Sequence, residues 1–290
     1  MTSAKERVFT FGSHRGLVGV LAEPAERTDP AVPAVLLYNV GLNHRVGPYR
    51  LNVDIARHLA AAGYASLRFD LSGLGDSVAR AGARSEIDRG MADVQDAMDF
   101  VTAKCGISSF VLVGLCSGVD PGHRLSVSDV RVKGAAFIDG YSYETPGYRL
   151  RVLLERGRKL LSPPRYFSWL NRRLGAAGQS LEIGDIPEIF DREYPPVDEF
   201  KRDVWRMIER DMQLLVINTG NTWFYNYAGQ FKDILGIREL PRQVEVDYWP
   251  DVDHVFTAVA HRQRLVQRLG GWVQCRFPLV RTEALANVAS

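Results

Sequence analysis

The apolar residues of this chain form two alternating kinds of segment along its 290 positions. Short continuous apolar runs, bounded by glycine, proline or polar turns, are typical of strands that are buried on both faces of a parallel sheet. These runs are found at residues 34–38, 64–69, 110–113, 133–138, 213–218 and 244–249. Longer segments with apolar residues at helical spacing lie among them, at residues 49–62, 85–104 and 256–274. The alternation of strand and helix predicts an α/β fold, with a mostly parallel central sheet flanked by helices.

The start of the chain departs from this rhythm. Residues 8–11 and 17–21 are short apolar runs on either side of the turn-rich sequence 12–16. Two such runs joined by a short loop that contains glycine indicate a β-hairpin. We therefore expect the chain to open with a hairpin.

A long interruption separates the later strands from the earlier ones. Residues 141–210 are rich in arginine, leucine and aromatic residues, but they contain no convincing strand. A structureless loop of this length is uncommon in a compact domain, so we predict a helical insertion over the strand ends. Glycines and prolines within residues 175–196 predict two helical pieces joined by an irregular stretch. The chain then divides into an α/β core, residues 1–140 and 211–290, and a helical cap or lid insertion, residues 141–210.

Composition narrows the class of protein further. A content of 46% hydrophobic residues is enough for a substantial core in one large domain. The 36 basic and 34 acidic residues leave a net charge of +2, without the basic stripe that nucleic-acid binding needs, so we expect no nucleic-acid partner. No stretch approaches the roughly 18 apolar residues of a membrane span, and the first residues lack a continuous apolar signal region. We therefore expect a soluble, cytoplasmic protein without a membrane partner.

The cysteines limit the chemistry that the chain can carry. Cys105, Cys116 and Cys275 are an odd number at wide spacing, which argues against both a disulfide framework and a zinc site. No dinucleotide fingerprint follows a strand, and the sequence implies no metal and no organic cofactor. We expect Cys105 and Cys275 to be packing residues on helices, whereas the neighbours of Cys116 indicate a different role.

Cys116 is the centre of the most specific motif in the chain. The pentapeptide Gly-Leu-Cys-Ser-Gly, residues 114–118, directly follows an apolar run. A nucleophile on a sharp turn from strand to helix leaves no room for side chains two residues before and after it, so glycine is needed there. The N–H of Ser117 would lie at a helix start, where unpaired donors and the helix dipole favour a thiolate and a developing oxyanion. The motif therefore predicts a nucleophile elbow with cysteine in the serine position.

This elbow, the glycine-rich loop at residues 68–77, the insertion and the late pair Asp253-His254 together resemble the α/β-hydrolase family, in the family's order. The resemblance covers nearly the whole chain. Within this family, the cysteine elbow and the cap together resemble uncharacterised bacterial hydrolases found with biosynthetic clusters. In its nucleophile the chain is similar to dienelactone hydrolases. The resemblance implies an α/β-hydrolase fold with Cys116 as nucleophile and His254 as general base and acid.

The resemblance also implies an oxyanion hole. Its first donor would be the N–H of Ser117, and its second would come from the loop after the strand at residues 34–38. In that loop the family often has His-Gly, where this chain has Asn39-Val40-Gly41. The N–H of Val40 or of Gly41 is therefore expected to complete the hole.

The acid of the triad is the point at which the chain leaves the family's usual pattern. The sequence after residues 213–218 reads Thr-Gly-Asn-Thr-Trp and offers no carboxylate. Asp139, which follows the preceding predicted strand, is the alternative that some family members use. Asn221 could instead orient the imidazole through its amide oxygen, as in cysteine-protease triads, because a thiolate–imidazolium pair needs its third member only for orientation. We favour Asp139.

A further set of residues is expected near the substrate. The candidates lie around the oxyanion loop, the proposed cap and the loop that faces it: Asn39, His44, Tyr141, Tyr143 and Trp223. His44 and the aromatic residues also have a simpler structural explanation, because His44 would suit a solvated turn and the aromatic residues would pack the lid on the body.

The favoured hypothesis is a hydrolase that cleaves an ester, lactone or thioester through a thioester intermediate on Cys116. An acyltransferase or a cyclising thioesterase would use the same intermediate, because amines attack a thioester more readily than an oxygen ester. A non-catalytic binding protein on a hydrolase fold is the alternative from another class. The expected partner is a small-molecule acyl substrate, carried free or on a carrier, whereas the acyl group, the acceptor and the oligomeric state stay open.

Overall fold

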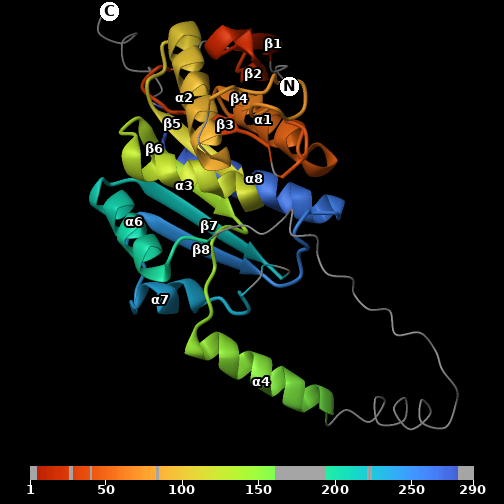
Figure 1. The fold of residues 1–290 in the computed structure, drawn as a ribbon, viewed down its shortest axis with the longest axis vertical. Helices are drawn as coiled ribbons and strands as arrows, with labels where there is room; N and C mark the ends of the chain where they lie inside the picture. Colours follow the sequence, from red (N-terminus) through yellow and green to blue (C-terminus); the bar gives the residue numbers. More distant parts are fainter. Residues whose placement is uncertain are drawn as a thin grey trace, which may run out of the picture.

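The computed structural model describes residues 5–25, 29–39, 41–82, 85–160, 194–220, 222 and 224–279. Its centre is an eight-stranded sheet in the order β1-β2-β4-β3-β5-β6-β7-β8 (Figure 1). Strand β2 runs antiparallel to its neighbours β1 and β4, and the strands from β4 to β8 across the sheet pair in parallel. The predicted fold class, a mostly parallel sheet with helices on its faces, is confirmed.

The strands follow the apolar runs of the sequence closely. They are β1 (Lys5–Phe11), β2 (Leu17–Glu23), β3 (Ala34–Leu37), β4 (Ser66–Phe69), β5 (Phe110–Leu115), β6 (Val132–Ile138), β7 (Gln213–Thr219) and β8 (Val244–Trp249). The expected opening hairpin is also confirmed, since β1 and β2 pair along their whole length from Lys5 with Glu23 to Phe11 with Leu17.

Helices cover both faces of the sheet. They are α1 (Leu51–Ala61), α2 (Glu86–Cys105), α3 (Val119–Ser128), α4 (Pro146–Leu160), α6 (Val197–Glu209), α7 (Gln230–Leu235) and α8 (Val259–Arg276), with 3-10 turns at Ser13–Arg15, Pro48–Arg50 and Cys116–Gly118. Apolar residues of α2, α3, α6 and α7 share one buried cluster with one face of the strands. Those of α1 and α8 share a second cluster with the opposite face.

Successive side chains of the central strands alternate between two buried clusters, one on each face of the sheet. Leu36 of β3 and Leu112 of β5 belong to the cluster on the α2 and α3 face, whereas their neighbours Val35 and Val111 belong to the cluster on the α1 and α8 face. All four side chains are fully buried. Because both faces are covered, these strands need apolar residues at every position, which explains the continuous runs in the sequence.

Helix boundaries agree with the predicted ones where local signals are strong. Ser85 caps α2 by accepting a hydrogen bond from the N–H of Asp88 at 3.1 Å, and Gly106 ends the helix in the left-handed conformation. The helix expected from residue 49 begins instead at Leu51, because Tyr49 and Arg50 have φ angles of 48° and 68°. Such angles are incompatible with a regular right-handed helix.

The predicted insertion is described at its two ends. Helix α4 extends away from the body in Figure 1. Thr145, the residue before the helix, is joined to the body by a hydrogen bond with Tyr227 at 2.7 Å. Helix α6 packs in the core, where Phe200 and Met207 are buried in the same cluster as α3 and the sheet. The irregular stretch predicted at residues 175–196 lies almost wholly outside the described residues. In the described part of the chain, none of the helices is both long and apolar enough to cross a membrane.

Candidate active site

The turn at Cys116 has the geometry that the pentapeptide predicts. Strand β5 ends at Leu115, Cys116 has a φ of 53°, and a 3-10 turn leads directly into α3. A Cβ atom on Gly114 would lie 2.6 Å from the carbonyl oxygen of Gly118, and one on Gly118 would lie 2.9 Å from that of Asn39. Both positions therefore require glycine, and the strained φ of Cys116 holds the half-buried thiol at the top of the turn.

His254 lies between Cys116 and Asp139. Its Nδ1 is 2.7 Å from Oδ2 of Asp139, and its side chain also forms a hydrogen bond with Cys116. Since Asp139 occupies Nδ1, the nitrogen that remains for the thiol is Nε2. The structure thus brings together three residues that are 23 and 115 positions apart along the chain, in the order thiol, imidazole and carboxylate.

Asp139 is held by the ends of two neighbouring strands. It follows β6, has a φ of 48°, and donates its own N–H to the carbonyl oxygen of Ile217 in β7 at 2.8 Å. Its buried carboxylate accepts hydrogen bonds from the N–H of Thr219 at 2.7 Å, from the hydroxyl of Thr219 at 2.8 Å and from the hydroxyl of Thr222. These three hydrogen bonds hold the Asp139 carboxylate in place next to the imidazole of His254.

The loop that carries His254 is packed against the end of β7. A Cβ atom on Gly220 would lie 2.2 Å from the carbonyl oxygen of Pro250, and the N–H of Gly220 donates to the carbonyl oxygen of Val252 at 3.0 Å. Asp253 then closes the turn by accepting from the N–H of Thr257 at 3.0 Å. This close approach places His254, the residue after Asp253, next to Asp139.

The surroundings of His254 favour its charged form. The hydrogen bond that Asp139 accepts from His254, followed by the hydrogen bond between His254 and Cys116, raises the pKa of His254 from 6.5 to about 10, although partial burial acts in the opposite direction. Negative partners stabilise an imidazolium more than its desolvation destabilises it here. The raised pKa of His254 favours an imidazolium at neutral pH, and an imidazolium next to a cysteine favours the thiolate, which is the nucleophilic form.

The loop after β3 lies beside the elbow. The N–H of Gly41 donates to the hydroxyl oxygen of Ser117 at 2.9 Å, so in this arrangement that N–H is already engaged. Val40, the other predicted donor of this loop, lies outside the described residues. The side chain of Asn39, a predicted substrate contact, is buried and donates to Oδ1 of Asp70 at 2.9 Å and to the carbonyl oxygen of Asn43 at 2.6 Å. Asn39 therefore shapes the loop from within.

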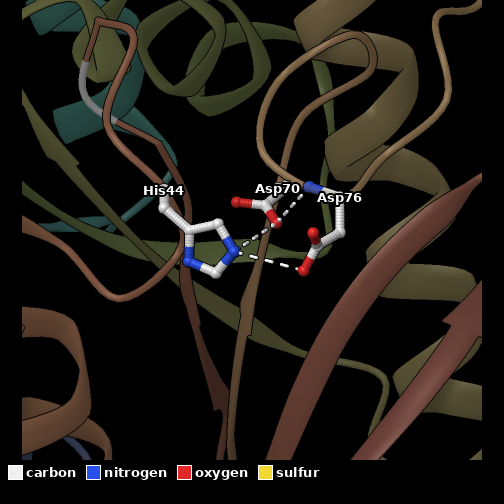
Figure 2. Close-up of side chains that lie close together, drawn as sticks. All are labelled: His44, Asp70 and Asp76. Atoms are coloured by element: carbon white, nitrogen blue, oxygen red, sulfur yellow. Dashed lines mark hydrogen bonds and ion pairs between the residues drawn. The ribbon is translucent and has the colours of Figure 1, made fainter.

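His44 belongs to a cluster that could suit a divalent cation by its donor types. Figure 2 shows Nε2 of His44 facing two carboxylates, at 3.4 Å from Oδ2 of Asp70 and 3.3 Å from Oδ2 of Asp76. Nη1 of Arg45, however, lies 2.7 Å from both Nε2 of His44 and Oδ2 of Asp76, and it also bonds to Asp70. The guanidinium thus stands where a cation would stand, and these residues do not fit a metal ion.

The remaining candidates divide between packing and positions outside the described residues. Tyr141 is buried and packs edge-on against Phe200 of α6, and Tyr143 donates its hydroxyl to the carbonyl oxygen of Pro195 at 2.7 Å. Both side chains therefore join α6 and its preceding segment to the body. Trp223 and Asn221 are not among the described residues, so the prediction for each stays a prediction.

The other two cysteines have different surroundings from Cys116. Cys105 is half-buried at the end of α2, where burial raises the pKa of its thiol, in keeping with a packing residue. Cys275 is exposed on α8. The prediction that Cys275 is a packing residue is wrong, because the apolar face of α8 consists of neighbours such as Trp272 and Val273.

Sequence reasoning missed the residues that hold Asp139. In the sequence, Thr219 and Thr222 belong to a segment that is distinguished only by its lack of a carboxylate. Their role depends on β6 and β7 lying side by side, which is a property of the sheet order. The available signal for this role is two threonines three positions apart, in the sequence Thr-Gly-Asn-Thr after a buried strand. This signal is weak. His123 is a buried residue of α3 whose ring forms a hydrogen bond with Asp203 of α6 at 3.0 Å, which is a structural role.

The similarity of this chain to known proteins lies in its structure. Its sequence matches no protein-family model and no curated protein. Many solved structures are similar. A hypothetical protein from Pseudomonas aeruginosa has a TM-score of 0.58 at 16% identity, with 96% of this chain and 95% of that chain covered.

Two other similar structures carry descriptions of their class. A Xanthomonas campestris protein, described as an α/β serine hydrolase without a lid, has a TM-score of 0.53 at 15% identity, with 97% of this chain and 98% of that chain covered. The esterase domain of a Rhodothermus marinus protein has a TM-score of 0.55 at 19% identity, with 94% and 99% covered. At these identities the likeness establishes the fold, and the chain has the α/β-hydrolase fold.

Proposed function

We propose that this protein is a hydrolase that cleaves an ester or thioester of a small molecule through an acyl-enzyme on Cys116. The observation that carries the proposal is the placement of His254, which bonds to Asp139 through Nδ1 and to Cys116 through its other nitrogen. A thiol, an imidazole and a buried carboxylate in this order form the arrangement that activates a nucleophile. The α/β-hydrolase fold supports the proposal, since structures that share it include proteins described as serine hydrolases and esterases.

The first half of the reaction forms a thioester. The Cys116 thiolate attacks the carbonyl carbon, and the electron pair of the C=O bond moves to oxygen, which the N–H of Ser117 stabilises as an oxyanion. The oxyanion then collapses, the bond to the leaving group breaks, and the leaving oxygen or sulfur takes the proton from Nε2 of His254. The imidazole is then neutral, and Asp139 keeps its orientation.

The second half releases the acyl group. Neutral His254 removes a proton from water, whose oxygen attacks the thioester carbonyl. Collapse of the second oxyanion breaks the carbon–sulfur bond and returns the thiolate beside the imidazolium. The products are a carboxylic acid and the free enzyme, and no metal ion or organic cofactor takes part in either half as written.

Acyl transfer is the second candidate, and it rests on the identity of the nucleophile. A thioester is attacked by amines more readily than an oxygen ester is, and water is a comparatively poor partner for it. The same Cys116 intermediate could therefore pass its acyl group to an amine, a thiol or a hydroxyl group of the same molecule, as a cyclising thioesterase does. The lifetime of the intermediate in water separates this candidate from hydrolysis.

Intact-mass spectrometry of the protein incubated with a small panel of p-nitrophenyl esters and acyl thioesters tests the proposal. We expect a covalent adduct on the wild type and on the matched variant Cys275→Ala, because Cys275 is an exposed thiol away from the elbow. Cys116→Ala should form no adduct. An adduct that disappears in water indicates a hydrolase, and one that persists until an amine or thiol is added indicates a transferase.

A contrary result is equally informative. If the wild type forms neither adduct nor product with any donor, catalysis through Cys116 is contradicted. A biological activity that Cys116→Ala leaves intact would then favour the binding-protein alternative.

A further inference from the structure

The hydroxyl of Ser117 joins two loops that are far apart in the sequence. Ser117 follows the nucleophile at the end of β5, whereas Gly41 follows β3, and the N–H of Gly41 donates to Oγ of Ser117 at 2.9 Å. Strands β3 and β5 are neighbours in the sheet, so their carboxyl ends place these two loops side by side. Ser117 thus contributes a main-chain donor next to Cys116 and, with its side chain, an acceptor for the loop that faces it.

The rest of this loop is anchored on the opposite side, to Asp70. The Asn39 side chain and the Arg45 main-chain N–H donate to Oδ1 of Asp70 at 2.9 and 2.6 Å, and the Arg45 guanidinium bonds to its other oxygen. Asp70 is fully buried. These bonds hold the two ends of the loop against the segment after β4.

The middle of the loop has much less around it. Gly41 has a φ of 50°, and a Cβ atom placed on it would meet no atom within 4 Å. Leu42, the next residue, is 76% exposed. A segment that is fixed at both ends and open in the middle depends on the few polar contacts that the middle makes, and the bond from Gly41 to Ser117 is one of them.

We propose that Ser117 is a positioning residue for the oxyanion hole, whose hydroxyl sets the distance between the loop after β3 and the elbow. The inference rests on the proposed function. Because the Gly41 N–H is used for this bond, its role is to hold the loop rather than to bind the oxyanion. The N–H of Ser117, the donor that the described residues offer to the oxyanion, keeps its position relative to the loop after β3 through the Ser117 hydroxyl. Loss of that hydroxyl should shift this N–H, and hydrogen-bond stabilisation of a transition state depends steeply on geometry.

Two reactions of the Cys116 thiol distinguish a positioning role of Ser117 in the oxyanion hole from an effect of Ser117 on the thiolate or on the fold. Acylation by p-nitrophenyl acetate passes through an oxyanion, whereas alkylation by iodoacetamide displaces iodide at a saturated carbon and forms none. Both reactions need the Cys116 thiolate. The two rates are measured by mass spectrometry at Cys116 in the wild type, in Ser117→Ala and in Ser117→Thr, with the melting temperature of each variant.

For Ser117→Ala we expect acylation to slow about tenfold or more, since deletion of a donor from such a hole costs roughly 10²–10³-fold and displacement of one costs less. Alkylation of the same variant should keep the wild-type rate. Ser117→Thr retains a hydroxyl at this position and should restore acylation toward the wild-type rate.

Three outcomes would overturn the inference, and they can be told apart. Acylation of Ser117→Ala at the wild-type rate would mean that the bond to Gly41 does not position the hole. An equal loss in acylation and alkylation would mean that Ser117 acts on the thiolate or on the fold, and the melting temperature would distinguish these two. A wild type that is alkylated but never acylated would contradict the proposed function itself, and the inference with it.

Discussion

Asp139, the acid of the proposed triad, follows β6, one strand earlier than the usual place of the acid in the family, and neighbouring residues hold its carboxylate in place. The carboxylate is bonded to both threonines at the end of β7, so the strand that would usually carry the acid supplies its donors instead. The imidazole of His254 then meets a carboxylate that three protein donors hold in place. At the scale of single residues, the acid and its support have been divided between two adjacent strands.

Exchange of Asp139 for asparagine tests this arrangement. Asp139→Asn removes the charge that pairs with the imidazolium and offers His254 an amide, so we expect kcat to fall by roughly 10²–10⁴-fold, as for a triad whose acid is neutralised. Asn221→Ala should leave kcat close to the wild-type value. A large loss in Asn221→Ala together with a small loss in Asp139→Asn would instead assign the orienting role to Asn221.

The titration of His254 gives a second prediction at this scale. Its pKa is raised to about 10 by Asp139 first and Cys116 second, so NMR should find the ring protonated at neutral pH. The pKa should fall in Cys116→Ala and fall further in Asp139→Asn, because each change removes one of the two causes. A wild-type pKa near 6.5 would contradict the pairing.

The same shift predicts how activity and stability depend on pH. Acylation needs the imidazolium as the acid, so its rate should decline as the pH rises past about 10. The raised pKa belongs to the folded state, so this interaction contributes its full stability below about pH 6.5 and loses it as the pH rises to about 10.

At the scale of elements, α6 shows that the end of the insertion belongs to the core. The helix falls within the residues predicted as cap, yet Phe200, Val204 and Met207 lie in the cluster that α3 and the sheet also form. Asp203 on the same face pairs with the buried ring of His123 in α3. Although burial would raise it, the pKa of Asp203 is lowered by this bond and by the nearby arginines. A separate cap would leave such a face without these partners.

Met207 provides the test for α6. Its side chain is fully buried, so Met207→Ala should lower the free energy of unfolding by about 2–5 kcal/mol in chemical denaturation, as large-to-small changes in a core do. Arg202→Ala, an exposed position on the same helix, should change it by no more than about 0.5 kcal/mol. Global stability that is unaffected by Met207→Ala would show that α6 unfolds separately from the core.

At the scale of the whole molecule, the sheet order explains why residues from distant parts of the chain meet. Strands β3, β5, β6, β7 and β8 are consecutive across the sheet and parallel, so the loops after them open at one edge. Those loops carry Gly41, Cys116, Asp139, Thr222 and His254. Ligand sites in open α/β sheets lie at this edge, where strand order reverses along the chain. Here β3 lies between β4 and β5, and the elbow follows β5.

Much of this edge could be predicted from the sequence because its signals are local. Continuous apolar runs mark strands buried on both faces, and the two glycines around Cys116 mark a turn in which any side chain would collide with the main chain. Asp139 directly follows such a run, and the resemblance to the family implies that a carboxylate at this place can serve as the acid. The strands and the turn depend only on neighbouring residues, whereas the choice of Asp139 also depends on that resemblance.

The parts that could not be predicted depend on contacts between distant segments. The threonines that hold Asp139 act only because β7 pairs with β6, and the face of α6 has the same apolar spacing whether it covers a core or a cap. Helix α7, with 6 residues, is too short for periodicity to reveal it. The bond from Gly41 to Ser117 spans 76 positions and depends on the sheet order.

The half-buried thiol of Cys116, paired with a protonated ring, has a consequence for the conditions under which the protein can work. In the proposed mechanism Cys116 acts as a thiolate, and a thiolate also attacks hydrogen peroxide: sulfur takes one oxygen to form a sulfenic acid, and the other leaves as water with a proton from His254. The serine of related folds has no such reaction. We expect dilute peroxide to abolish acylation of Cys116 and dithiothreitol to restore it, with Cys275→Ala behaving as the wild type, so that the activity of this protein would follow the redox state of its surroundings.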